Sequence, residues 1–395
     1  MNGWLLVLLA VMLAATGVFL AYCRRKRLHI WVPRYAADAV ARTIRPRRPG
    51  PGLQHVLFLF VDHFELAGKA DRLDAWMSRY PEIARVHRDA DGHMPRHSWF
   101  YALDLMHEHE VAAIGQLVDA GMGELELHWH HDHDDEQSFR RKLRGGMEVF
   151  HRHGHMLPHR EDRPATFGFI HGNWSLDNSR GARFCGVDGE IGVLLEEGCY
   201  ADFTFPALFN EAQPSLVNRL YYAKETGGPK SYRDGIPARR GRKPADDELM
   251  LFQGPLSINW RDWRFRWHPT FEDGDINAGA THGEAVRIDA WVRHALRVEG
   301  RPEWLFVKVF CHGAQDHASV CGPASDRMFA HLEETYNDGR RFKLHYVTAR
   351  EAYNVLRAAE DGKAGDPGQY RDYIIPAPAE RRSAYLHRQR RSGSA

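Results

Sequence analysis

The residues best suited to chemistry lie in four short segments, each of which directly follows a run of apolar residues. They are residues 62–65, 128–135, 171–174 and 312. Histidines and carboxylates dominate these segments, and the whole chain has 25 histidines among 395 residues. Neutral imidazoles and carboxylates are the ligands that zinc and similar cations prefer. The sequence therefore predicts a site for one divalent metal ion, with zinc as the expected ion.

The second segment is the densest, with four histidines and three aspartates within eight residues. A period of two separates the preceding strand into two faces, one with Glu124, Glu126, His128 and His130 and the other with Leu125, Leu127 and Trp129. We expect metal ligands at His128, His130, Asp132 and His133. A solvated loop is the alternative interpretation, but it does not explain why the run begins inside a strand.

The other three segments hold fewer candidates. A carboxylate such as Asp62 that leaves a buried strand costs free energy unless it is paired or used, although it could also cap the following turn. His171, Asn173 and Trp174 are candidate substrate-binding residues, and Trp174 either stacks on a sugar ring or belongs to the core. His312 ends another strand, and that position favours a catalytic role for it over a structural one.

These segments require a scaffold that brings strand ends together. Strands are predicted at residues 55–61, 98–102, 124–129, 166–170, 201–205, 249–252, 304–310 and 344–347. Helical patterns occupy residues 71–87, 108–120, 137–153, 190–197, 284–298 and 349–356. The alternation predicts an α/β fold with a parallel sheet or barrel covered by helices. The candidate residues follow the carboxyl ends of the strands, where parallel α/β folds place their active sites.

The two ends of the chain differ from this globular part, which we assign to residues 53–356. Residues 1–23 carry no charge and match the roughly 20 apolar residues of a single transmembrane helix. A cleaved signal peptide is the alternative, but the segment has no basic residue at its start. Residues 24–52 are rich in Arg and Pro, which is typical of a linker, and residues 357–395 form a polar, basic tail.

Composition narrows the classes of function. The formal net charge is +1 and no basic stripe is visible, which argues against binding to nucleic acid. The five cysteines are scattered and contain no CxxC pair, so we expect neither a disulfide framework nor a cysteine zinc site. Unpaired cysteines are typical of a reducing compartment.

Taken in order, the four segments make residues 55–356 resemble a divergent member of the polysaccharide deacetylase-like (NodB-homology) family. The resemblance implies a distorted (β/α)7-type barrel behind the transmembrane helix. Val61-Asp62-His63 stands at the family's Phe-Asp-Asp-type motif. Glu126-Leu127-His128 matches the start of the family's motif of two histidines separated by three residues, and Asp132 replaces the second histidine.

The resemblance also implies roles and a reaction. Asp62 would be the general base, His63 would replace a metal-binding carboxylate, and His312 would be the general acid. The substrate would be a carbohydrate, an N-acetylated amino sugar or polysaccharide, from which the enzyme releases acetate.

Three alternatives to this function remain. One is a glycoside hydrolase that pairs Asp62 with Glu65, Glu126 or Asp202. Another is a non-catalytic scaffold that binds glycan or organises a membrane assembly. A metallophosphoesterase is disfavoured, because its Gly-Asp and Gly-Asn-His elements are absent in the required order.

The basic residues after the apolar helix generate a prediction about topology. Because positively charged flanks stay on the cytoplasmic side, the domain should face the cytoplasm at the cell membrane. Enzymes of the resembled family usually act outside the cytoplasm, so the exterior is the competing location. A reporter that is active only outside the cytoplasm should stay silent when fused after Ala395. Strong reporter activity would contradict the cytoplasmic assignment.

Overall fold

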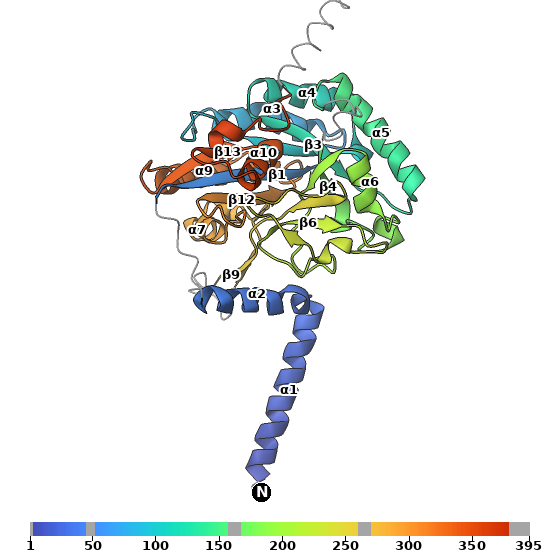
Figure 1. Ribbon diagram of the computed structural model, residues 1–395, viewed down its shortest axis with the longest axis vertical. Helices are drawn as coiled ribbons and strands as arrows, with labels where there is room; N and C mark the ends of the chain where they lie inside the picture. The colour runs from blue at the N-terminus through green and yellow to red at the C-terminus, as the bar shows by residue number, and fades with distance from the viewer. Residues whose placement is uncertain (1–2, 45–51, 157–166, 260–269, 379–395) are drawn as a thin grey trace, which may run out of the picture.

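The computed structural model describes residues 3–44, 52–156, 167–259 and 270–378. They form a mixed α/β domain around one large, mostly parallel sheet, with a long helix projecting from it (Figure 1). The strands of this sheet are β1(Gln54–Phe64), β2(His97–Ala102), β3(Gly123–Trp129), β4(Phe167–His171), β5(Cys199–Asp202), β6(Leu220–Lys224), β7(Ile236–Pro237), β8(Glu248–Phe252), β11(Asp275–Ile276), β12(Trp304–Cys311) and β13(Phe342–Val347). A separate antiparallel pair consists of β9(Ser257–Asn259) and β10(Thr270–Glu272).

The helices are α1(Gly3–Arg25), α2(Leu28–Ile44), α3(Ala70–Ala84), α4(Glu108–Asp119), α5(Glu136–Arg152), α6(Glu190–Glu196), α7(Ala285–Arg293), α8(His317–Val320), α9(Pro323–Tyr336) and α10(Ala349–Glu360). Each of the eight predicted strands corresponds to a strand of the main sheet. The alternation of strands and helices is confirmed, and with it the α/β class.

The predicted barrel is not confirmed. The strand order is β11-β12-β1-β2-β3-β4-β5-β8-β6-β7, with β13 beside the first half of β1. Within the described residues, the two ends of this order do not pair, so the sheet is open. Two antiparallel strands, β6 and β7, follow β8 at one edge. They lie between residues 220 and 237, where the sequence patterns predicted no strand.

The two faces of the sheet belong to different apolar clusters. On β1, Val56, Phe58 and Phe60 pack in a cluster that contains residues of α3, α4, α5 and α9. We call this side of the sheet its outer face, and the opposite side its inner face. The neighbouring residues Leu57, Leu59 and Val61 pack in a second cluster on the inner face, which includes residues of α10. Because strand side chains alternate, consecutive residues at a strand end must also point to opposite faces.

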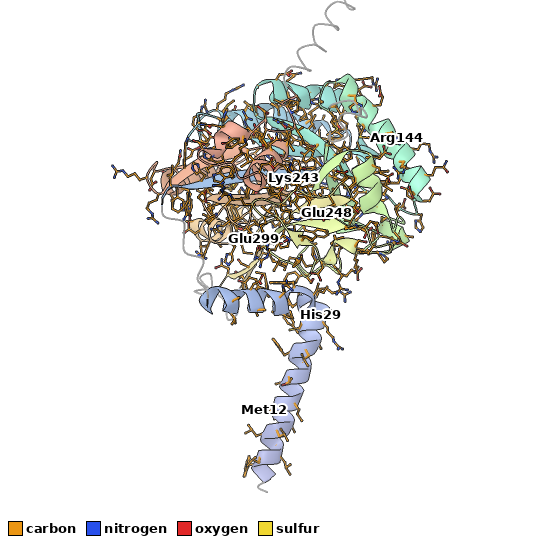
Figure 2. All side chains as sticks on the ribbon, viewed as in Figure 1. Met12, His29, Arg144, Lys243, Glu248 and Glu299 are labelled. Atoms are coloured by element: carbon orange, nitrogen blue, oxygen red, sulfur yellow. The ribbon has the colours of Figure 1, made fainter. Side chains whose placement is uncertain are left out.

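The N-terminal helices form an L-shaped element at the base of the domain (Figure 1). The helix over Trp4–Arg25 is unburied along its apolar part and is long and apolar enough to cross a membrane. Its side chains, such as Met12, project into open space (Figure 2). A signal sequence would have the same properties.

Helix α2 lies within residues 24–52, where we had expected a linker. Trp31 is fully buried against Val217 and Leu256. Asp38 forms an ion pair with Arg219 at 2.7 Å. The apolar face of this segment explains the difference, because it packs on the domain despite the many arginines nearby.

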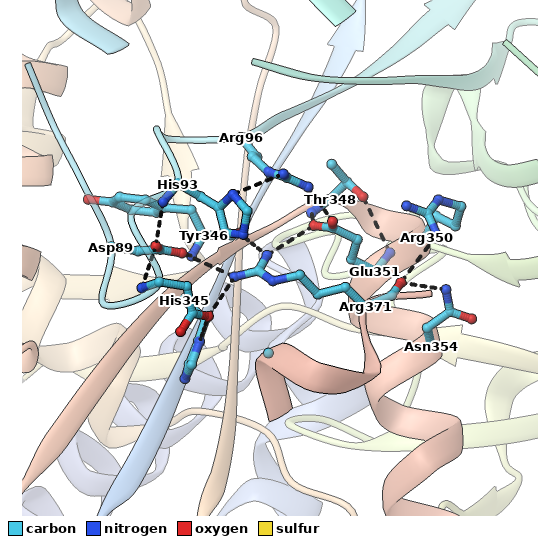
Figure 3. A network of polar contacts seen from close by, with 12 residues as sticks. Asp89, His93, Arg96, His345, Tyr346, Thr348, Arg350, Glu351, Asn354 and Arg371 are labelled. Atoms are coloured by element: carbon cyan, nitrogen blue, oxygen red, sulfur yellow. Dashed lines mark hydrogen bonds and ion pairs between the residues drawn. The ribbon is translucent and has the colours of Figure 1, made fainter. Parts of the chain in front are cut away.

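Residues 357–378 also differ from the expected polar tail, while residues 379–395 lie outside the described residues. Arg371 forms ion pairs with Asp89 at 3.1 Å and with Glu351 at 3.2 Å (Figure 3). Asn354 of α10 donates to the carbonyl groups of Arg371 and Ile375. These buried contacts fasten the segment after α10 to the domain.

This network predicts a specific loss of stability in acid. Burial favours a raised pKa for Glu351, but Arg96 and Arg371 lower it from 4.5 to about 2. The stabilisation is therefore complete above pH 4.5 and is lost as the pH falls toward 2. Glu351→Gln, which keeps an oxygen for the α10 capping box, should cost about 3–5 kcal/mol near neutral pH.

Urea unfolding of the full chain between pH 7 and pH 3 measures this effect. The variant should show a flatter loss of stability in acid than the wild type. Glu334→Gln, at an exposed position on α9, serves as the control and should behave like the wild type. Equal acid dependence of Glu351→Gln and wild type would contradict the assignment.

Candidate metal centre

Four histidines and one glutamate meet at the carboxyl ends of β1, β3 and β12, on the inner face of the sheet. The rings of His63 and His128 are 5.0 Å apart, and those of His63 and His312 are 4.7 Å apart. The His130 ring lies 4.5 Å from that of His128. Glu65 lies on the same side as His63, because the two are two positions apart in the chain. Of the predicted strand-end residues, His63, His128, His130 and His312 therefore lie together.

Glu65, His128 and His130 form the tightest part of this group, with donor atoms within 4.8 Å of one another. Glu65 Oε1 is 3.5 Å from His128 Nε2 and 3.4 Å from His130 Nε2. The set contains one carboxylate and two imidazoles, a combination that zinc accepts in proteins. The Glu65 and His130 side chains remain partly exposed, at 16% and 27%, whereas His128 is fully buried.

The Nδ1 atoms of His128 and His130 both have polar partners. His128 Nδ1 lies 2.9 Å from the carbonyl oxygen of Ile170, so we assign the ring proton to Nδ1. His130 Nδ1 lies 3.3 Å from Asp104 Oδ2, and the His130 amide donates to Asp104 Oδ1. Carbonyl and carboxylate partners of this kind orient metal-binding histidines in known sites.

With these tautomers, the Nε2 lone pairs of His128 and His130 both face a Glu65 oxygen. His128 Nε2 is buried and has no hydrogen-bond partner among the described residues. Three acceptors directed at one point repel one another unless a cation or a proton lies between them. The arrangement therefore fits a divalent cation.

The electrostatics of the group favour neutral imidazoles at His63 and His128 beside an ionised Glu65 carboxylate. Burial lowers the pKa of His128 below 6.5, and burial together with His312 lowers the pKa of His63 well below 6.5. Burial alone would raise the pKa of Glu65, but His128 and His130 hold it below its ordinary value. Burial opposes charge on His130 as well, but Asp104 raises its pKa.

Two predicted ligands lie elsewhere. The side chains of Asp132 and His133 are 74% and 69% exposed and contact each other at 3.7 Å. The chain turns outward after His131 because Asp135 caps the start of α5, in a capping box with Ser138. The prediction of Asp132 and His133 as ligands of this centre is therefore not supported by the geometry.

Asp62 also lies outside the centre. Its carboxylate accepts hydrogen bonds from His97 Nε2 at 2.9 Å and from the Gly313 amide at 2.7 Å, and it is fully buried on the outer face. Alternation along β1 is the reason, because Asp62 and His63 are consecutive. The structure thus places the predicted base and the histidine beside it on opposite faces.

The three candidate substrate-binding residues separate in the same way. The Trp174 ring lies 6.2 Å from both His63 and His312, and its buried indole N–H has no hydrogen-bond partner among the described residues. Asn173 is next to it, and its carbonyl oxygen accepts from Arg180. His171 faces away, and its ring lies 4.6 Å from that of His131.

Sequence reasoning missed Glu65 as a member of this group and Asp104 as the partner of His130. Glu65 appeared only in the glycosidase alternative, although its spacing of two from His63 places it on the inner face. Asp104 was not considered, although it follows the second predicted strand just as Asp62 follows the first. The period of two and the strand-end position were the signals available for both residues.

A cavity of about 650 Å³ lies at the other end of the sheet and does not touch this group. Gly123 and Glu124, at the start of β3, line it together with Arg350 and Arg371. The charged groups that line it are already paired, as with Arg350 and Glu124 at 2.7 Å. Size alone therefore does not make it the better candidate.

Comparison with known proteins adds no assignment. No protein-family model matches the chain, and no curated protein matches its sequence.

The convergence of Glu65, His128 and His130 predicts a bound metal ion. The full chain, purified in detergent and equilibrated with zinc, should lose about one equivalent of metal on His128→Ala. His133→Ala is the matched control, because it removes an exposed histidine of the same loop. Atomic absorption of both variants measures the effect. Equal metal content in His128→Ala and wild type would show that the centre does not hold the ion.

Proposed function

We propose that the chain is a membrane-attached, metal-dependent hydrolase, and that it removes N-acetyl groups from an amino sugar or polysaccharide. The hydrolase part rests on the centre at Glu65, His128 and His130. The deacetylase part rests on the resemblance to the polysaccharide deacetylase-like family. Helix α1 would anchor the domain, with the cytoplasmic side favoured by the basic flank.

One observation carries the proposal. Glu65 Oε1 lies 3.5 Å from His128 Nε2 and 3.4 Å from His130 Nε2. His128 Nε2 is buried without a hydrogen-bond partner in the described part of the chain. When bound there, a divalent cation supplies Lewis-acid polarisation of a carbonyl group and makes water more acidic.

His63 and His312 supply groups for proton transfer beside this set. His63 is outside the group whose donor atoms lie within 4.8 Å, so we assign it to proton transfer instead of to the cation. Its lowered pKa keeps the imidazole neutral, so that its lone pair faces the site, and also makes it a weaker base than a free imidazole. The His312 ring lies 4.7 Å from that of His63 and is partly exposed. It would protonate the departing amine. Trp174 lies next to both rings and would position the sugar.

The glycosidase alternative receives less support from the carboxylates. Glu126 is buried and accepts from the Tyr200 hydroxyl and the Gly168 amide. Asp202 is buried and accepts from the Thr204 amide and hydroxyl. Glu65 and Asp104 are partly exposed, but both contact His130. Asp62 lies on the opposite face of the sheet, so its pairs with Glu65, Glu126 or Asp202 are not placed to flank one glycosidic bond.

Two variants test the mechanism. His312→Ala should lower kcat for acetate release by about 10²–10⁴, with the metal content and Tm kept, because it removes a proton donor. Asp62→Asn should lower Tm, because it disturbs the bonds to His97 and Gly313, with little change in activity per folded molecule.

Acetate release from a panel of N-acetylglucosamine oligomers, with and without chelator, measures these effects on the full chain. Acetate release that survives complete metal removal would contradict the metal-dependent mechanism. Cleavage of the oligomers into shorter sugars in the presence of chelator, without acetate release, would favour a two-carboxylate glycosidase. Metal binding without hydrolysis of any panel member would favour the scaffold alternative.

A further inference from the structure

A second group of potential ligands lies behind the first, on the opposite face of the sheet. His131, His171, Cys185 and Glu190 each offer a donor atom, and these atoms all lie within 4.8 Å of one another. Their exposed fractions are 4% for His131 and 0% for the other three. None of them belongs to the centre at Glu65. We propose that they bind a structural zinc ion.

The distances fit four-coordinate zinc. Glu190 Oε1 lies 3.0 Å from His131 Nε2 and 3.4 Å from His171 Nε2. Cys185 Sγ lies 3.6 Å from Glu190 Oε2. Zinc bonds of 2.0–2.3 Å in a tetrahedron separate neighbouring ligand atoms by about 3.3–3.6 Å. These three distances therefore lie within a few tenths of an ångström of the zinc values.

The orientation of His171 points to a cation. Its Nδ1 lies 2.6 Å from the Gly172 carbonyl oxygen, so the ring proton is assigned to Nδ1. The opposite nitrogen, Nε2, then presents a lone pair to the Glu190 carboxylate. This nitrogen is fully buried and has no hydrogen-bond partner in the described part of the chain. Two buried acceptors that face each other are unfavourable without a positive group between them.

A plain hydrogen-bond network does not account for the whole group. A protonated His131 between Glu190 and Asp134, at 3.0 and 3.4 Å, would satisfy that ring. The Cys185 thiol can donate to the Val187 carbonyl oxygen at 3.7 Å and to Glu190 Oε2 at 3.6 Å, but His171 Nε2 would remain unsatisfied. Thiolate, imidazole and carboxylate are all ligand types that bind zinc, whereas calcium and magnesium prefer oxygen ligands.

The surroundings indicate a structural role. All four protein ligands are present and buried, so no coordination position remains open for a substrate. The ligands come from four segments: the loop after β3, the end of β4, the segment before residue 186, and the start of α6. Two backbone bonds already join the first and third of these, from the Asp134 amide to the Cys185 carbonyl oxygen and from the His133 amide to the Ala182 carbonyl oxygen.

Zinc–sulfur scattering identifies this site without any variant. Zinc X-ray absorption of the full chain, purified in detergent and loaded with zinc, should show a sulfur neighbour near 2.3 Å. The centre at Glu65 has no sulfur ligand, so the signal reports only on the second site and should persist in His128→Ala. A wild-type chain that binds no zinc, or binds it without sulfur, would overturn the proposal.

A matched pair of cysteine variants completes the test. Cys185→Ser should lose the sulfur signal and about one equivalent of zinc, with a lower Tm. Cys199→Ser, at a buried β5 cysteine whose thiol donates to the Ala201 carbonyl oxygen, should keep both the signal and the metal. A sulfur signal that survives Cys185→Ser would overturn the assignment. If Cys185→Ser fails to fold, the wild-type spectrum decides.

Discussion

The strict alternation of side chains along parallel strands is the constraint on which both candidate sites depend. At the carboxyl ends of β1, β3 and β4 it divides a crowded set of polar residues between two faces. His63, His128 and His130 go to the inner face, while Asp62 and His171 go to the outer face. A shift of one residue in any of these strands would exchange the two sets. The apolar clusters on each face fix the register and therefore the chemistry.

Burial gives the two groups their shared character. Histidines removed from water remain neutral unless a carboxylate compensates, and a neutral imidazole offers a lone pair to a cation. Carbonyl oxygens of Ile170 and Gly172 take the remaining ring protons of His128 and His171, which directs both free nitrogens toward a glutamate. The backbone at the end of β4 thus orients ligands on both sides of the sheet.

Much of this organisation could be predicted from the sequence, because strand positions and the alternation on β3 follow from local patterns. The convergence of His63, His128 and His312 followed from the rule that parallel strand ends share one edge. The outward turn at Asp132 and His133 could not be foreseen, because it depends on how Asp135 caps α5. The partners of Asp62 were also hidden, since His97 and Gly313 lie 35 and 251 residues away. Closure of the sheet is a long-range property that no local pattern encodes.

The buried contacts of α2 have a consequence for how the domain meets its surroundings. A flexible tether would let the domain tumble above the lipid surface. Here Trp31 and the Asp38–Arg219 pair hold the second helix against the domain, and the first helix leaves it at a steep angle (Figure 1). If α1 spans a bilayer, the domain keeps one side toward the lipid headgroups. The chain would then encounter its substrate by lateral diffusion in a single, fixed pose.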